Sequence, residues 1–469
     1  MSDSMMDQKQ YFFCGIGGSG MLPLAMILRG QGADVSGSDR ALDQGRTPEK
    51  FDWLRSQGIA LFPQDGSGLV SRDQVLVASA AIEDTVPDVA AALAYGCRRV
   101  SRAELLSKLF NAAPKSIGVA GTSGKSTTTA MIAWILSESG LAPTVMNGAV
   151  MKNFMGPGVP FASALVGQGD IFVSEVDESD GSIAMYNPTV AVLNNVSLDH
   201  KSMNELRALF GDYLAKSEAG VLNADDREVA ALAIQSCAAQ TYGFDDEQVD
   251  LFAHTIEPGP TSISCKLTQR DGVDVPLQLC VPGRHNISNA MAAICATRMC
   301  GVDLADSAAA LSRFAGIKRR FEIVGEAAGV TVIDDFAHNP DKIAATLKTL
   351  RDFPGRLLIV FQPHGFGPLR KMRGELASAF AENLESDDVL VLPEPVYFGG
   401  TVDRSVSSAD VAGDINAQGK RAEALATREA CGRRVLALAQ PRDRIVIMGA
   451  RDDTLSDFAA SLLQELQQR

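Results

Sequence analysis

The sequence predicts an α/β protein with three domains, each built on a mostly parallel sheet. Its 469 residues are too many for a single core, because domains hold about 150 residues on average. Short apolar runs of strand length alternate with helix-forming stretches, a pattern typical of parallel sheets with crossover helices. At residues 15–20 and 121–124, a strand is followed by a glycine-rich turn and a helix, as in nucleotide-binding α/β folds.

The first predicted domain, residues 1–111, is Rossmann-like. Its first strand, at residues 11–14, leads into a glycine-rich turn. Pro114 disfavours helix in the residue before it, so we expect a linker at residues 111–114. The other elements expected here are helices at 21–29 and 87–95 and strands at 33–39 and 74–80.

The second predicted domain, residues 112–317, resembles a P-loop ATPase-type unit, and the third, residues 318–469, is again Rossmann-like. In the second we expect strands at 116–120, 171–176 and 190–193 and helices at 126–139, 206–215 and 289–299. In the third we expect strands at 330–333, 357–361, 389–392 and 444–448. No segment of 20 to 50 residues repeats, which argues against a solenoid.

Composition excludes several classes of protein. A net charge of −14 argues against nucleic acid or an anionic membrane as the main partner, because phosphate backbones attract clustered Lys and Arg. The eight cysteines form no C-x-x-C pair, which indicates reduced thiols rather than disulfides or a zinc site. The polar start of the chain and the lack of a run of about 20 apolar residues predict a cytoplasmic protein without signal peptide or membrane span.

The strongest motif is Gly-Thr-Ser-Gly-Lys-Ser-Thr at residues 121–127, between a predicted strand and a predicted helix. Glycines let backbone N–H groups turn toward phosphate oxygens, and the helix N-terminus adds partial positive charge. Lys125 can reach the β- and γ-phosphates of ATP, and the hydroxyl of Ser126 or Thr127 can bind Mg²⁺. The bland alternative is a glycine-rich turn with an exposed lysine.

The first glycine-rich turn, Gly15 to Gly20, is a weaker signal. Asp39 follows at about the distance of one βαβ step, which fits a dinucleotide fingerprint with the carboxylate on a ribose. The same geometry suits any nucleotide diphosphate, so NAD, FAD and a UDP-sugar remain equal candidates, beside a turn that binds no ligand.

Two polar motifs follow strands of the second domain. Residues 174–181 place four carboxylates close together, which suits Mg²⁺ unless the segment is an acidic surface turn. His200 follows the next strand and can bind a second metal or the γ-phosphate, although an isolated histidine is more often structural. Asn286 and Asn289 lie three residues apart on one helix face, where they can contact the nucleotide or cap the helix.

Two further motifs fall in the third domain. Arg319 and Arg320 can supply a cation to a transferring phosphoryl group, and the acids of residues 334–335 can contact the ATP ribose. Phe-Gln-Pro-His at residues 361–364 ends a strand, where ligands of α/β sheets usually bind.

Taken in order, these motifs resemble those of the Mur ligase family across nearly the whole chain. The carriers are G-T-S-G-K-S-T at 121–127, E-V-D-E-S-D at 175–180, N-V-S-L-D-H at 195–200, G-R-H-N-I-S-N-A at 283–290, R-R-F-E at 319–322 and D-D-F-A-H-N-P at 334–340. The segments at 15–21, 35–39, 78–82 and 361–364 are most similar to the branch that adds L-alanine to UDP-N-acetylmuramate. A branch that recycles a murein tripeptide shares much of this pattern.

The resemblance implies an N-terminal domain for a UDP-sugar, a central domain for ATP and Mg²⁺, and a C-terminal domain for an amino acid or peptide. The implied catalytic residues are Lys125, Glu175, His200 and Arg320. The implied cofactor-binding residues are Gly121, Thr122, Gly124, Lys125, Ser126, Thr127, Asn286, Arg320 and Asp335. The implied substrate-binding residues are Gly15, Gly17, Gly18, Ser19, Asp39, Ser79, His338 and His364. The implied metal ligands are Ser126, Thr127, Glu175 and His200.

Phe210 aligns with a lysine that some relatives carbamylate, and in this it agrees with the alanine-adding and recycling branches. Three features depart from the family pattern. Ser123 stands where these branches usually have histidine, and the stretch between His200 and Asn223 is short. Residues 365–369 replace arginines that meet the amino acid's carboxylate in the alanine-adding branch, and only Arg370 remains nearby.

The activity implied is an ATP-dependent, ADP-forming amide ligase of peptidoglycan synthesis that acts through an acyl phosphate, with L-alanine as the expected amine. Alternatives are a Mur-type ligase for another amine or acid, a non-catalytic UDP-sugar-binding regulator, and a Rossmann oxidoreductase, which leaves the phosphate loop unexplained. A monomer or a homodimer is expected.

Overall fold

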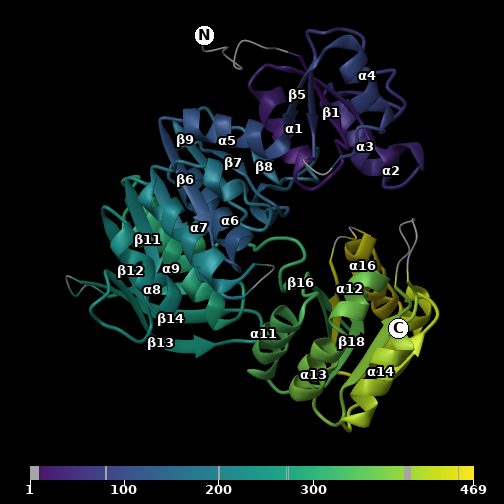
Figure 1. Ribbon diagram of the computed structural model, residues 1–469. Coiled ribbons are helices and arrows are strands. Elements are labelled where there is room, and N and C mark those ends of the chain that lie inside the picture. Colours follow the sequence, from purple (N-terminus) through teal and green to yellow (C-terminus); the bar gives the residue numbers. More distant parts are fainter. Residues whose placement is uncertain are drawn as a thin grey trace. The chain divides into compact units, whose positions relative to one another are not determined.

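The computed structural model describes residues 10–79, 82–198, 201–270, 272, 274–395, 403–450, 452 and 454–469. These residues form two compact units (Figure 1). The first unit comprises the chain up to residue 256 with residues 264–279 and 285–315, and the second comprises residues 257–263, 280–284 and 316–469.

The first sheet of the first unit has five strands in the order β3-β2-β1-β4-β5, all paired in parallel. Its strands are β1 (Gln10–Cys14), β2 (Asp34–Ser38), β3 (Ala60–Phe62), β4 (Val75–Ala78) and β5 (Arg98–Ser101). The helices are α1 (Met21–Gly30), α2 (Arg40–Asp43), α3 (Pro48–Ser56), α4 (Pro87–Tyr95) and α5 (Arg102–Ala112). The strand order reverses beside β1, so the first glycine-rich turn lies at a topological switch point.

The second sheet of this unit has ten strands in the order β15-β14-β13-β12-β11-β10-β6-β9-β7-β8. Its strands are β6 (Lys115–Ala120), β7 (Thr144–Met146), β8 (Ala164–Leu165), β9 (Ile171–Glu175), β10 (Val190–Leu193), β11 (Ala219–Asn223), β12 (Ala239–Gly243), β13 (Leu251–Pro258), β14 (Ile263–Gln269) and β15 (Asp274–Leu279). Its helices are α6 (Lys125–Glu138), α7 (Met203–Ala215), α8 (Arg227–Leu232), α9 (Arg284–Arg298) and α10 (Leu304–Leu311), with 3₁₀ turns at Lys152–Phe154, Ser182–Met185 and Ala233–Gln235. The strand β6 lies between β9 and β10 and is parallel to both. The carboxyl ends of these three strands therefore meet at one edge.

One apolar core joins the two sheets of the first unit. It includes Phe13 of β1, a strand of the first sheet, and Tyr213 of α7, a helix that packs on the second sheet. Between them, Phe110 of α5 packs edge-on against Phe172 of β9, with ring centroids 5.9 Å apart, and against Tyr186, at 5.2 Å. Such aromatic contacts add to the burial of apolar area.

The second unit is a six-stranded sheet in the order β16-β17-β21-β18-β19-β20. Its strands are β16 (Glu322–Ala327), β17 (Val330–Asp335), β18 (Leu357–Phe361), β19 (Val389–Pro393), β20 (Ala422–Leu425) and β21 (Arg444–Met448). Its helices are α11 (Pro340–Arg351), α12 (Phe366–Lys371), α13 (Arg373–Asn383), α14 (Ser408–Ala417), α15 (Arg428–Leu438) and α16 (Thr454–Gln467). The edge pair β16–β17 is antiparallel, and the other pairs are parallel.

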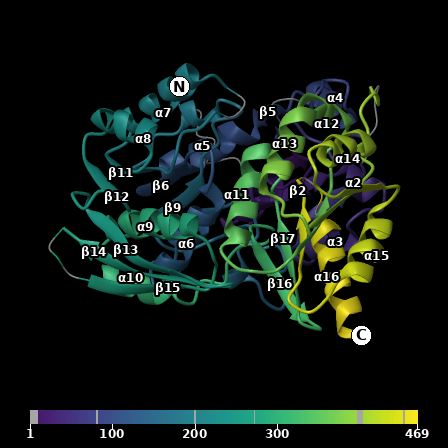
Figure 2. The ribbon, with the colours of Figure 1, turned by 90° about the horizontal axis from the view of Figure 1, so that it is seen from below.

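Helices cover both faces of the six-stranded sheet of the second unit (Figure 2). Side chains alternate along β18: Ile359 packs with α11, α13 and α14, whereas Leu358 and Val360 pack with α15 and α16. Burial on both faces explains why β18 is a continuous apolar run rather than an alternating one.

The predicted α/β fold with mostly parallel sheets is confirmed. One local prediction was wrong, because α5 continues through Ala112 where we expected a linker from residue 111. Pro114 restricts only Ala113, whose extended backbone ends the helix. In the part of the chain that the structure describes, no helix is both long and apolar enough to cross a membrane.

Candidate nucleotide and ligase site

The phosphate loop lies where β6 ends, between the carboxyl ends of β9 and β10. Two of its glycines have left-handed backbone, with φ of +127° at Gly121 and +81° at Gly124. A Cβ at Gly124 would lie 2.5 Å from the Asn289 side-chain oxygen, so a larger residue has no room. The sequence therefore places glycine where conformation and space both demand it.

Asn195, which follows β10, holds the loop in shape. Its side-chain oxygen accepts hydrogen bonds from the Ser123 N–H at 2.8 Å and the Thr122 hydroxyl at 2.9 Å. Its amide group donates to the Ser123 carbonyl at 3.2 Å. A single side-chain amide thus holds the Thr122 hydroxyl and both backbone groups of Ser123.

The two residues that open α6 are each paired with a carboxylate. The Lys125 ammonium lies 2.8 Å from an oxygen of Glu178 and 2.7 Å from the Gly121 carbonyl. The Ser126 hydroxyl donates to Glu175 at 2.7 Å. Of the predicted site residues, Ser126 and Glu175 are in contact, and Lys125 is the neighbour of Ser126 in the chain. Gly121, Thr122, Gly124 and Thr127 lie in the same loop and helix start.

A buried chain of polar side chains supports the loop from the side of α9. The Asn194 amide donates to the Thr128 hydroxyl at 3.0 Å, and that hydroxyl donates to Asn289 at 3.3 Å. Asn289 in turn donates to Asn286 at 3.2 Å. The predicted shared face of Asn286 and Asn289 is confirmed, and Asn289, whose side-chain oxygen lies against Gly124, stands between Asn286 and the loop.

The residues at this edge suit a magnesium nucleotide. Oxygen ligands are what Mg²⁺ prefers, and the Ser126 hydroxyl and the Glu175 carboxylate already lie together. Burial alone raises the pKa of the neighbouring Asp177, but the Lys125 cation and hydrogen bonds from Ser179 outweigh it and hold that pKa below its usual value. His200, the other predicted metal ligand, lies outside the described residues.

The first glycine-rich turn is built differently. The Gly17 N–H donates to an oxygen of Asp39 at 2.8 Å, and the other oxygen accepts from the Ala41 N–H at 2.7 Å and caps α2. The Lys50 ammonium, from α3, lies 3.3 Å from the Gly17 carbonyl. Asp39 therefore shapes the turn, and its remaining lone pairs can still accept from a ribose hydroxyl.

The exposed part of this turn comprises Gly18 and Ser19, with Gly15 half-buried below them and Ser79 exposed at the end of β4. Arg102, at the start of α5, lies against the turn: its Cδ would be 3.0 Å from a Cβ at Gly20. Its guanidinium also lies 3.5 Å from Asp180 of the acidic motif. Arg102 therefore connects the turn with the acidic motif.

In the second unit, the two neighbouring arginines have different environments. Arg319 is buried and donates to the carbonyls of Gly449 at 2.7 Å and Asp452 at 2.9 Å, with Asp334 at 3.4 Å. Arg320 stacks on the ring of Phe336, with its Cζ 4.4 Å from the ring centroid. Arg319 is thus committed to the fold, which favours Arg320 as the functional arginine.

Asp335 is the last residue of β17, and His338 and His364 follow the ends of β17 and β18. These two strands lie on either side of β21. Burial raises the pKa of Asp335, whose carboxylate accepts from the Thr346 hydroxyl at 2.5 Å. Burial lowers the pKa of His338 to about 4, and the nearby charges of Lys342, Arg320 and His364 act in the same direction. The hydrogen bond to the Phe336 carbonyl opposes this shift. Since His338 Nδ1 lies 2.8 Å from the Phe336 carbonyl, Nδ1 carries the proton and Nε2 the lone pair.

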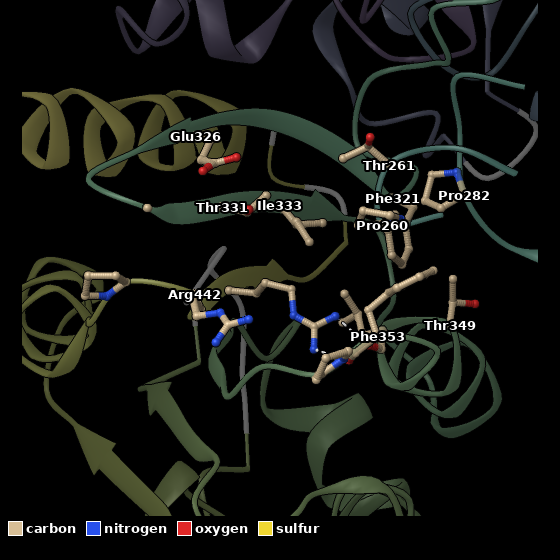
Figure 3. Close-up of a pocket in the computed structure, with 15 residues that line it drawn as sticks. Pro260, Thr261, Pro282, Phe321, Glu326, Thr331, Ile333, Thr349, Phe353 and Arg442 are labelled. Carbon is tan, nitrogen blue, oxygen red and sulfur yellow. Dashed lines mark hydrogen bonds between the residues drawn. The ribbon is translucent and has the colours of Figure 1, made fainter. Parts of the chain in front are cut away.

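A separate pocket of about 300 Å³ lies at the other end of this sheet, near the start of β17 and β21 (Figure 3). Phe321, Ile333 and Phe353 line it beside Arg442 and Glu326. Among the predicted site residues that the structure describes, none lines this pocket. Asp335, His338 and His364 lie at or beyond the opposite ends of β17 and β18.

Sequence reasoning missed Asn195, Glu178, Lys50 and Arg102 as site residues. Glu178 and Asn195 belong to the motifs at residues 174–181 and 195–200. Their position just after a predicted strand was the signal that could have identified them. Lys50 and Arg102 stand in helices far from any glycine-rich motif, and only the folded chain brings them to the first turn.

Comparison with known proteins follows the same order of domains. Residues 10–113 match the Mur ligase family catalytic domain, residues 119–297 the Mur ligase middle domain, and residues 319–451 the Mur ligase glutamate ligase domain.

Individual relatives span most of the chain. A UDP-N-acetylmuramate–L-alanine ligase of Synechococcus sp. (strain JA-3-3Ab) is 39% identical over 394 residues, which cover 83% of this chain and 74% of that protein. A ligase of the same name from Agrobacterium fabrum is 36% identical over 473 residues, covering 97% and 96%. The crystal structure of UDP-N-acetylmuramate-alanine ligase from Thermotoga maritima has a TM-score of 0.78 at 25% identity and covers 98% of this chain and 99% of that one.

Proposed function

This chain belongs to the Mur ligase family, and from that premise we propose that it joins L-alanine to UDP-N-acetylmuramate in peptidoglycan synthesis. It is an ATP-dependent ligase that forms amide bonds and acts on a UDP-sugar and an amino acid. The observation that carries the proposal is the phosphate loop, in which Lys125, Ser126, Glu175 and Asn195 converge after three adjacent strands. The names and coverage of its relatives support L-alanine as the amine.

The first step is transfer of the γ-phosphoryl group of ATP to the lactyl carboxylate of the muramate. A carboxylate oxygen attacks the γ-phosphorus, ADP leaves, and an acyl phosphate forms. Lys125 and the N–H groups at the start of α6 are assigned to offset the charge on the phosphoryl oxygens, as in other phosphoryl transfers. Ser126, Thr127 and Glu175, with His200, are proposed to hold Mg²⁺, which when bound adds positive charge at the phosphates.

The second step is attack of the amine on the acyl phosphate. A tetrahedral intermediate forms and collapses to the amide and inorganic phosphate. We assign His338 and His364 to the amine side, because neutral His338 offers the Nε2 lone pair to an ammonium proton. Arg320 is assigned to the phosphoryl group, and Asn286 and Asp335 are assigned to the nucleotide.

The N-terminal turn is assigned to the UDP-sugar. The Ser19 hydroxyl is assigned as a donor to the diphosphate, and Gly15, Gly17 and Gly18, whose N–H groups bond within the turn, give the diphosphate a close approach to it. Asp39 and Ser79 are assigned to the nucleoside or sugar. These assignments define a domain order of UDP-sugar, ATP and amino acid along residues 1–111, 112–317 and 318–469. Since both nucleotide substrates are cytoplasmic, we propose that the enzyme works there.

One observation favours a second candidate, a ligase of the same chemistry for another amine. Gly365, which follows His364, has left-handed backbone and precedes helix α12. In the alanine-adding branch, this segment usually holds arginines. Arg370, the one arginine of that helix, forms an ion pair with Asp403. The carboxylate of the amino acid must then be met by different groups.

The test is phosphate release from MgATP in the presence of UDP-N-acetylmuramate with L-alanine, other amino acids or the murein tripeptide. We expect stimulation by L-alanine, and mass spectrometry of the product should show the added residue. Stimulation by a different amine alone would move the assignment to the second candidate. Silence with every amine would overturn the muramate assignment.

A further inference from the structure

We propose that Glu178 occupies the phosphate-binding position of Lys125 when no nucleotide is bound, and that the phosphates of ATP displace it. The inference rests on the proposed ATP site and adds a residue that sets its affinity. Glu178 thus acts as an internal anion that competes with the substrate.

The geometry of Lys125 carries the proposal. Its ammonium makes two bonds, to the Glu178 carboxylate at 2.8 Å and to the Gly121 carbonyl at 2.7 Å. The Glu178 side chain is 5% exposed and the Lys125 side chain 17%. A carboxylate buried to that degree needs a cation beside it, because an unpaired charge in the interior is costly.

The position of the pair explains its role. Lys125 is the first residue of α6 and follows Gly124, and its ammonium folds back onto the Gly121 carbonyl of the loop. In the proposed ATP site the phosphates lie at this helix N-terminus. A phosphate oxygen at the lysine takes the place that a Glu178 oxygen now holds. ATP must therefore break one charged hydrogen bond in order to form another. Its observed affinity is the intrinsic affinity multiplied by the fraction of molecules in which Lys125 is not paired with Glu178.

Two of the neighbouring acids, Asp180 and Glu175, make contacts elsewhere and do not share this role. Asp180, in the same motif, faces Arg102 at 3.5 Å and is 45% exposed, so a change there alters the charge but not the lysine pair. Glu175 contacts the Ser126 hydroxyl rather than the lysine. Glu178 is the acid of residues 174–181 for which the structure shows an ion pair with Lys125.

The experiment compares Glu178→Gln with the charge-matched control Asp180→Asn in direct binding of ATP and ADP by calorimetry, without acid or amine substrate. The amide has the same size as the carboxylate but no charge, so most of the attraction to the Lys125 ammonium is lost. We expect the dissociation constant for ATP to fall about tenfold in Glu178→Gln, the scale of one charge-assisted hydrogen bond. In Asp180→Asn it should stay within about twofold, because the lysine pair is kept.

Unchanged or weaker nucleotide binding in Glu178→Gln overturns the proposal and assigns Glu178 to positioning Lys125 instead. Glu178→Ala, which also removes the pair, provides the same comparison if the amide variant does not fold. Phosphate release by the unmodified enzyme is measured in parallel. Its failure with every amine would refute the proposed reaction but leave the comparison of binding constants valid.

Discussion

The two glycine-rich turns of the first unit follow parallel strands at similar positions, yet they use acidic residues in opposite ways. In the turn after β1, Asp39 bonds the backbone N–H of Gly17 and completes the turn. In the loop after β6, a neutral amide, Asn195, takes that structural role, and acids pair with Lys125 and Ser126 instead. An acid that bonds the backbone supports the turn, whereas an acid that bonds the functional lysine competes with the ligand.

Each turn also has a lysine on a glycine carbonyl, but its source differs. Lys125 belongs to the helix that follows its loop, and Lys50 comes from α3. In the proposed reaction, phosphoryl transfer takes place at the second turn, so the comparison predicts unequal effects when the two lysines are removed.

The largest expected effect is from Lys125→Met. Loss of a cation preorganised for the transferring phosphoryl group should lower kcat about 10²- to 10³-fold, the usual cost of removing one such group. Lys50→Met is the matched control, and it should raise KM for the UDP-sugar while kcat changes little. Steady-state phosphate release at saturating and limiting substrate separates the two results. Equal losses of kcat in both variants would contradict the division of roles.

The next prediction compares the thermal stability and ATP binding of Gly124→Ala and Gly15→Ala. Both glycines have left-handed backbone, which costs an alanine about 1 kcal/mol. At Gly15 nothing lies within 4 Å of the added Cβ, whereas at Gly124 the Asn289 oxygen lies 2.5 Å away. We therefore expect a small loss of melting temperature in Gly15→Ala and a larger loss, with weakened ATP binding, in Gly124→Ala. Similar losses in thermal unfolding would show that the loop relaxes around the clash.

A third prediction concerns Asp39. In Asp39→Ala the Gly17 N–H and the start of α2 lose their acceptor, which should cost about 1 kcal/mol of stability for the cap alone and weaken UDP-sugar binding. Asp39→Asn keeps one acceptor and should lie between the alanine variant and the unmodified enzyme. Calorimetric titration with UDP-N-acetylmuramate measures this. Tighter binding after removal of Asp39 would contradict the supporting role given to this acid.

The smallest effect is expected at Ser123. The loop uses the backbone N–H and carbonyl of this residue, both held by Asn195, and its side chain is exposed. Ser123→Ala should therefore leave ATP turnover within about twofold. Asn195→Ala, which releases the same backbone groups, should raise KM for ATP clearly more. A large loss in Ser123→Ala would show that the side chain, and not the backbone, contacts the nucleotide.

Sequence patterns predicted the strands well where burial is continuous, as at residues 357–361 and 444–448, which match β18 and β21. They predicted the phosphate loop because glycine, lysine and hydroxyl residues are adjacent in the chain. They did not predict β13 to β15, which lack an uninterrupted apolar run. They could not reveal the pairing of Lys125 with Glu178. These residues are 53 positions apart, and at that separation the sequence does not indicate which acid contacts which cation.

The apolar core that runs from Phe13 to Tyr213 has a consequence for unfolding. Because one core joins the first two sheets, we expect them to melt as a single cooperative block, while the second unit, with cores of its own, melts separately. Differential scanning calorimetry should then resolve two transitions from three sheets. A fragment cut after α5 would leave the face of Phe110 without Phe172 and Tyr186, and we expect it to aggregate rather than to fold as an independent sugar-binding module.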